Sequence, residues 1–141
     1  DGLAADIPAM CEAYERQIED WGGVDIQLLG IGHDGHIGFN EPGDHFPVMT
    51  HEVKLTEMTR EANKRFFSSI DEVPTAAVTM GVGTVMAARK IVMVITGADK
   101  ADILYKVFFG PVTPEVPGSI LQFHHDVTLI CDEAAAARMP Q

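Results

Sequence analysis

The chain has 141 residues, of which 46% are hydrophobic and 22% charged, which suits one domain with a sizeable core and excludes an intrinsically disordered segment. Its 10 Lys and Arg stand against 21 Asp and Glu, and the net charge of -11 argues against a nucleic-acid or anionic-membrane surface. Its apolar runs fall short of the roughly 18 residues that span a bilayer. Because Cys11 and Cys131 match no disulfide or metal pattern, we expect a soluble, cytoplasmic protein.

The first predicted elements are a helix and a buried strand. Asp6 can cap a helix whose apolar residues recur every three or four positions, and Gly22 and Gly23 end it. Residues 24–29 form a short apolar run that predicts a buried strand. A glycine-rich loop, residues 30–43, follows that strand at its carboxyl end.

The middle of the chain predicts shorter elements. Val53 and Leu55 indicate a strand, and Thr59 is predicted to cap a helix that runs to Phe67. Residues 75–80 predict another strand. Gly81 and Gly83 then open a short helix.

The last third has the clearest strand, residues 91–96, followed by a turn at residues 97–100 and a helix that runs to Phe109. A short helix at residues 119–122, a strand at residues 127–131 and an alanine-rich helical tail complete the chain. This alternation predicts a three-layer α/β/α open, mostly parallel sheet with helices on both faces. Ligands bind beyond the carboxyl ends of such strands, where the loops 30–43 and 97–100 lie.

The candidate catalytic residues lie in the loop 30–43. His36 has Asp34 two positions before it and Glu41 five positions after it, and a carboxylate can hold an imidazole in one tautomer for general acid-base catalysis. The alternative is a turn-rich loop that collects such residues because they tolerate turns. The spacing alone leaves both interpretations open.

A metal site is a competing interpretation, because His33, Asp34, His36 and Glu41 are all possible ligands. Their spacing matches no known metal-binding pattern, so we expect no metal.

The motif Gly-Ile-Gly-His-Asp-Gly-His-Ile-Gly-Phe-Asn-Glu-Pro-Gly at residues 30–43 resembles the signature of the glucosamine-6-phosphate deaminases. The resemblance continues in six further stretches, at residues 63–67, 73–74, 79–84, 97–100, 119–122 and 131–133. It implies the fold shared by phosphosugar isomerases, deaminases and CoA-transferase-like proteins. It also implies conversion of glucosamine 6-phosphate and water to fructose 6-phosphate and ammonia, without a cofactor.

The resemblance also implies roles for single residues. His36 would move a proton during opening of the sugar ring, with Asp34 and Glu41 orienting it. Arg65 and Lys100 would contact the substrate phosphate. The backbone at Gly32, Gly35 and Gly97 would line the pocket.

Part of the family pattern has no counterpart here, namely the carboxylate that shuttles the C2 proton and a phosphate-binding loop. We therefore expect residues 1–141 to form a single α/β catalytic domain that lacks its amino-terminal portion. The small-molecule partner would be an amino-sugar phosphate, and a homo-oligomer is compatible with the family. The alternatives are a galactosamine-6-phosphate deaminase, a 6-phosphogluconolactonase-like hydrolase and a non-catalytic sugar-phosphate sensor.

Overall fold

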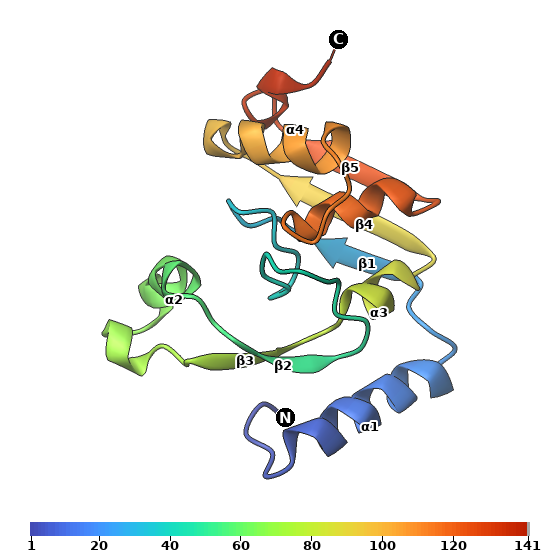
Figure 1. Cartoon of the computed structure of the whole chain (residues 1–141), viewed down its shortest axis with the longest axis vertical. Coiled ribbons are helices and arrows are strands. Elements are labelled where there is room, and N and C mark those ends of the chain that lie inside the picture. The colour runs from blue at the N-terminus through green and yellow to red at the C-terminus, as the bar shows by residue number, and fades with distance from the viewer. Residues whose placement is uncertain (141) are drawn as a thin grey trace.

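The computed structural model describes residues 1–140 and alternates helices with short strands (Figure 1). The helices and strands are α1 (Ile7–Asp20), β1 (Ile26–Leu29), β2 (His51–Lys54), α2 (Glu57–Asn63), β3 (Ala76–Thr79), α3 (Val82–Met86), β4 (Lys90–Ile95), α4 (Ala101–Phe109) and β5 (Val127–Cys131). Short 3-10 helices lie at Lys64–Phe66, Ile70–Glu72, Ala98–Lys100, Pro117–Phe123 and Ala135–Arg138. No helix in the described range is long and apolar enough to cross a membrane.

The main sheet has the strand order β1-β4-β5, with both pairs parallel. The register places Leu28 opposite Val92 and Ile91 opposite Val127. Parallel neighbours need a crossover between them, and α4 supplies the one between β4 and β5. The predicted α/β class with a mostly parallel sheet is therefore confirmed.

A second, two-stranded sheet joins β2 and β3 in antiparallel register, with His51 opposite Thr79. It lies apart from the parallel sheet (Figure 1). The burial of β2 alternates along the strand, as it does when one face of an antiparallel sheet meets solvent.

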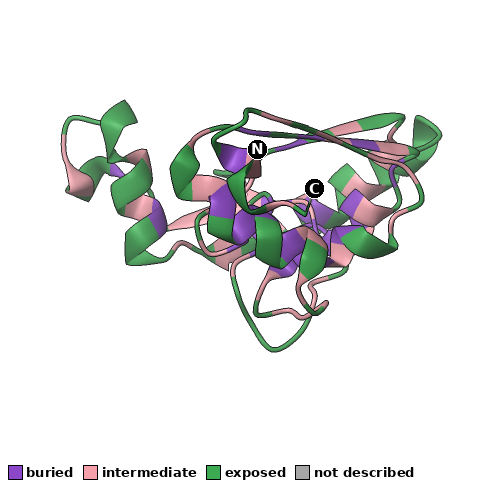
Figure 2. Cartoon of the chain, turned by 90° about the horizontal axis from the view of Figure 1, so that it is seen from above, coloured by how far each residue is buried: buried purple, intermediate pink, exposed green. Residues whose placement is uncertain are grey.

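One face of the parallel sheet is packed and the other is bare. Ile91, Met93 and Ile95 are at most 3% exposed and join one core cluster with residues of α3, α4 and the last two 3-10 helices. Leu28 and Val94, which point to the opposite face, are 66% and 43% exposed. Within residues 1–140 the helices cover one side of this sheet only, as Figure 2 shows along its upper edge.

The predicted cap of α2 was wrong. The helix begins at Glu57, and the Thr56 side chain caps it by accepting a hydrogen bond from the Thr59 backbone N–H at 3.2 Å. Thr56 lies in extended backbone, as an N-cap must, whereas Thr59 already lies inside the first turn. The hydroxyl of Thr59 is therefore available for a contact outside the helix.

The carboxylate of Glu15 fastens α1 to the rest of the chain. Its Oε1 accepts hydrogen bonds from the Thr50 backbone N–H at 2.6 Å and from the Thr84 hydroxyl at 2.7 Å. Burial by itself raises the pKa of Glu15, but these hydrogen bonds outweigh it and leave the pKa below its ordinary value. The ionised form is therefore favoured in the folded state.

Replacement of this carboxylate should destabilise the protein. We expect Glu15→Gln to lower the free energy of unfolding near neutral pH by about 1 to 2 kcal/mol, because two hydrogen bonds to a charged acceptor are weakened. A depressed folded-state pKa stabilises at neutral pH and loses that effect as pH falls through it. Urea unfolding should therefore show the difference between wild type and variant shrinking on acidification. The exposed neighbour Glu19→Gln is the control, and equal effects of the two variants would contradict the assignment.

Candidate active site

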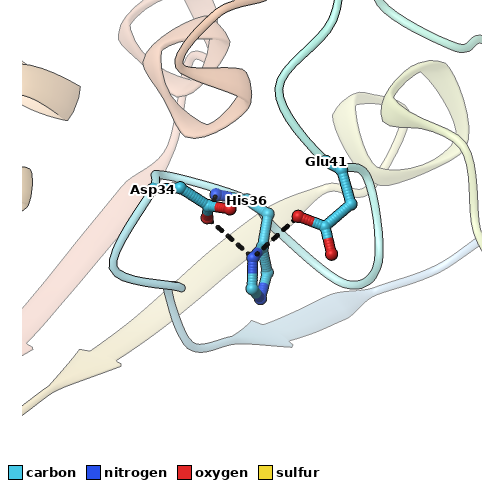
Figure 3. Close-up of side chains that lie close together, drawn as sticks. All are labelled: Asp34, His36 and Glu41. Atoms are coloured by element: carbon cyan, nitrogen blue, oxygen red, sulfur yellow. Dashed lines mark hydrogen bonds and ion pairs between the residues drawn. The ribbon is translucent and has the colours of Figure 1, made fainter. Parts of the chain in front are cut away.

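The loop that leaves the carboxyl end of β1 brings one histidine between two carboxylates (Figure 3). His36 Nδ1 lies 2.8 Å from Asp34 Oδ1 and 3.5 Å from Glu41 Oε2. Asp34 Oδ1 also accepts a hydrogen bond from the His36 backbone N–H at 3.1 Å. We call Asp34, His36 and Glu41 the triad. The sequence placed the three in one loop, and the fold brings their side chains into contact.

Two glycines let this loop wrap the imidazole. A Cβ atom on Gly32 would overlap the His36 ring, so a side chain at position 32 would displace the histidine. Gly35 has a φ of +91°, which favours glycine, and its Cβ would lie 2.7 Å from Val116 Cγ1. The Gly32 N–H donates to the His36 carbonyl at 3.0 Å, which closes the turn. Both glycines therefore shape the triad rather than simply terminating a strand.

Asn40 and Thr59 orient the far side of the triad, and the sequence analysis gave neither this role. Asn40 is 1% exposed, and its Nδ2 donates to the carbonyls of Ile37 at 3.0 Å and Met80 at 2.8 Å. These bonds anchor the loop to the end of β3. The Thr59 hydroxyl donates to Glu41 Oε1 at 2.5 Å. The position of Asn40 in the motif at residues 30–43 could have indicated its role, whereas nothing local in the sequence connects Thr59 with Glu41.

The two carboxylates have opposite pKa shifts. For Asp34, burial raises the pKa, but the hydrogen bond from the His36 backbone and the charge of His36 outweigh it and lower it. For Glu41, burial raises the pKa, and the neighbouring Asp34 carboxylate adds to the rise, while Thr59 and His36 oppose it. Asp34 is therefore the more readily ionised member of the pair.

An ionised Asp34 only accepts hydrogen bonds, so it fixes the imidazole proton on Nδ1. Nε2 is then the unprotonated nitrogen of a neutral His36, and within residues 1–140 it has no hydrogen-bond partner. The triad side chains are 10% to 21% exposed, so they are shielded yet reachable from solvent. This arrangement can accept a proton at Nε2 and stabilise the resulting imidazolium.

Lys100 reaches the triad loop from the carboxyl end of β4. Its Nζ donates to the Ile31 carbonyl at 2.9 Å and lies 3.4 Å from His33 Nδ1. Burial lowers the pKa of Lys100, while the carboxylates of Asp99 and Asp34 oppose that change. The loops that follow β1 and β4 therefore meet, as expected at the carboxyl edge of a parallel sheet.

His33 pairs with Asp99 and not with a member of the triad. Its Nε2 lies 2.6 Å from Asp99 Oδ2, and both side chains are more than half exposed. His33 is therefore not part of the cluster that could hold a metal, which consists of Asp34, His36 and Glu41.

Gly97 and Arg65, two of the predicted site residues, contact groups outside the triad. Gly97 has a φ of +99°, and its N–H donates to both carboxylate oxygens of Asp132, at 3.0 and 3.1 Å. That N–H already has an anionic acceptor. The Arg65 guanidinium lies over the Phe66 ring, 4.8 Å from its centroid. Within the described range, no hydrogen bond or ion pair joins Arg65 to Lys100 or to the triad.

The chain matches the sequence model of the family described as glucosamine-6-phosphate isomerases/6-phosphogluconolactonase over residues 2–130. A glucosamine-6-phosphate deaminase of Lachnoclostridium phytofermentans is 56% identical over 130 residues, which are 92% of this chain and 55% of that protein. One of Clostridioides difficile is 51% identical over 139 residues, 99% of this chain and 56% of that protein. The chain thus spans about half the length of the curated relatives that it matches.

Solved structures agree with this match. A monomeric glucosamine-6-phosphate deaminase superposes with a TM-score of 0.92 at 47% identity, over 97% of this chain and 57% of that one. A 6-phosphogluconolactonase from Trypanosoma cruzi shares the fold, with a TM-score of 0.68 at 23% identity, over 93% of this chain and 51% of that one. On the extent of the sequence match, the chain belongs to the family of glucosamine-6-phosphate isomerases and 6-phosphogluconolactonases.

Proposed function

We propose that the protein containing these residues is a glucosamine-6-phosphate deaminase, which converts glucosamine 6-phosphate and water to fructose 6-phosphate and ammonia. The observation that carries this proposal is the His36 imidazole, with Nδ1 against Asp34 and Glu41 and with no hydrogen-bond partner for Nε2 among residues 1–140. Relatives called glucosamine-6-phosphate deaminase, 51% to 56% identical over nearly the whole chain, support it. The lactonases in the comparison share the fold alone.

His36 is assigned the proton transfer that opens the sugar ring. Nε2 takes the proton of the anomeric hydroxyl as the bond between C1 and the ring oxygen breaks. It then gives that proton to the ring oxygen, which leaves an open-chain aldehyde. Asp34 stabilises the transient imidazolium through Nδ1, and the Glu41 carboxylate lies 3.5 Å from the same nitrogen.

Lys100 is proposed to bind the substrate phosphate. Its ammonium group lies beside the triad loop, at Ile31, so a sugar held over His36 would place its phosphate nearby. The proposal for Arg65 rests on the resemblance alone, because that side chain stacks on Phe66. Gly32, Gly35 and Gly97 are proposed to shape the pocket backbone. We propose no resident metal or organic cofactor for the reaction.

We also propose that residues 1–141 are part of one α/β catalytic domain whose remaining residues pack on the bare sheet face. Sheets with parallel strands are normally covered on both faces, yet Ile26, Leu28, Val94 and Ile130 are 43% to 66% exposed. A cavity of about 870 Å³ between α1, β2 and α3 is also apolar in its lining. The relatives are nearly twice as long as this chain. The two free cysteines fit a cytoplasmic location.

Replacement of His36 tests the proposed proton carrier in the full-length protein. We expect His36→Asn to lower kcat/KM for glucosamine 6-phosphate by about 10²- to 10⁴-fold, the usual contribution of a general acid-base group. Ammonia and fructose 6-phosphate should be measured together. His45→Asn removes an exposed histidine that also has a carboxylate neighbour, so it should retain wild-type rates. Wild-type activity in the His36→Asn variant would contradict the proposal.

Thr59 tests whether the orientation of Glu41 matters. We expect Thr59→Val to lower kcat about tenfold with little change in KM, because Glu41 loses the one hydrogen bond that fixes its Oε1. The exposed Thr75→Val serves as the matched control. A rise in KM at constant kcat would assign Thr59 to substrate binding instead.

A further inference from the structure

The triad contains a buried carboxylate oxygen without a hydrogen-bond partner. Glu41 Oε2 is fully shielded from solvent and accepts no hydrogen bond within residues 1–140, and the Glu41 side chain is only 10% exposed. Buried polar atoms in folded proteins nearly always have a partner. In Figure 3 the Glu41 carboxylate points at His36 Nδ1, so the missing partner would lie inside the triad.

The geometry of the triad suits a metal ion. One ligand atom from each of Asp34, His36 and Glu41 lies within 4.8 Å of the others. A tetrahedral ion with nitrogen and oxygen ligands at about 2.0 to 2.1 Å separates those ligands by about 3.3 Å. The separations from Nδ1 here are 2.8 and 3.5 Å, each within about half an ångström of that value.

The donor set selects the kind of ion. Imidazole nitrogen favours zinc, cobalt, nickel and copper, whereas magnesium and calcium prefer sites built from oxygen alone. Two carboxylates supply the negative charge that a divalent ion requires. Three protein ligands leave a fourth position for water, and the partial exposure of the triad lets an ion enter from solvent.

We propose that Asp34, His36 and Glu41 bind a divalent transition-metal ion that takes the place of the Nδ1 proton and inhibits the enzyme. The binding stands on geometry alone, whereas the inhibition rests on the proposed function. When an ion occupies Nδ1, the proton of the neutral imidazole lies on Nε2 instead. Nε2 then has no lone pair with which to accept the anomeric proton.

The other histidine-carboxylate pairs supply the contrast. His45 and Asp44 approach to 2.6 Å, but both are largely exposed and no third ligand joins them within residues 1–140. If any histidine beside a carboxylate sufficed, His45 would bind an ion as well as His36 does. The third ligand and the burial distinguish the triad.

Cobalt(II) is the probe, because its visible absorption reports ligand geometry independently of activity. The full-length wild type titrated with Co²⁺ should gain one absorbing ion per chain and lose deaminase activity in parallel. Mg²⁺ at equal concentration should do neither. We expect His36→Asn and Glu41→Gln to weaken Co²⁺ binding at least about tenfold, because each removes a direct ligand. His45→Asn should bind as wild type does.

The outcomes separate the two claims. Unchanged Co²⁺ binding in both His36→Asn and Glu41→Gln would overturn the site, and Glu41→Gln keeps the side-chain shape, so this arm does not depend on a folding defect. Co²⁺ absorption that requires His36 while wild-type activity persists would uphold the site and overturn the role of His36 in the proposed reaction. Co²⁺ absorption that appears in the wild type as its activity is lost, and that weakens in both His36→Asn and Glu41→Gln, supports both claims.

Discussion

The contact between the His36 imidazole and the Asp34 carboxylate is the interaction on which the candidate site depends. The 2.8 Å separation fixes the proton on Nδ1 and gives Nε2 its free lone pair. It exists because position 32 has no side chain, since a Cβ there would occupy the space of the ring. A glycine in the loop after β1 therefore makes room for the histidine ring.

The second carboxylate connects two parts of the fold that share no strand pairing. Glu41 lies in the loop that follows β1 of the parallel sheet, yet its carboxylate accepts a hydrogen bond from the Thr59 hydroxyl of α2. Asn40, in the same loop, donates a hydrogen bond at the end of β3. The helix α2 thus holds Glu41 directly, and the end of β3 anchors the neighbouring Asn40. Burial raises the pKa of both carboxylates, but for Asp34 the hydrogen bond from the His36 backbone and the charge of His36 outweigh it, so the two pKa values shift in opposite directions.

The parts of the structure that follow from local patterns could be predicted. Residues 127–131 form a strand with the predicted bounds, and Asp6 caps α1 as expected. The parts that depend on long-range packing could not. Thr59 was misassigned as the cap of α2, which is Thr56, and local patterns cannot reveal that the Thr59 hydroxyl faces a carboxylate 18 positions earlier. Likewise, nothing around Gly97 indicated that Asp132 already binds its N–H.

The candidate site requires that Asp34 hold the neutral His36 ring with its proton on Nδ1 and its lone pair on Nε2. Nitrogen-15 NMR of the imidazole in the full-length protein measures this directly, because protonated and unprotonated ring nitrogens differ widely in chemical shift. We expect a protonated Nδ1 and an unprotonated Nε2, with a shift toward the opposite tautomer in Asp34→Ala. A neutral wild-type ring with its proton on Nε2 would contradict the proposed role of Asp34.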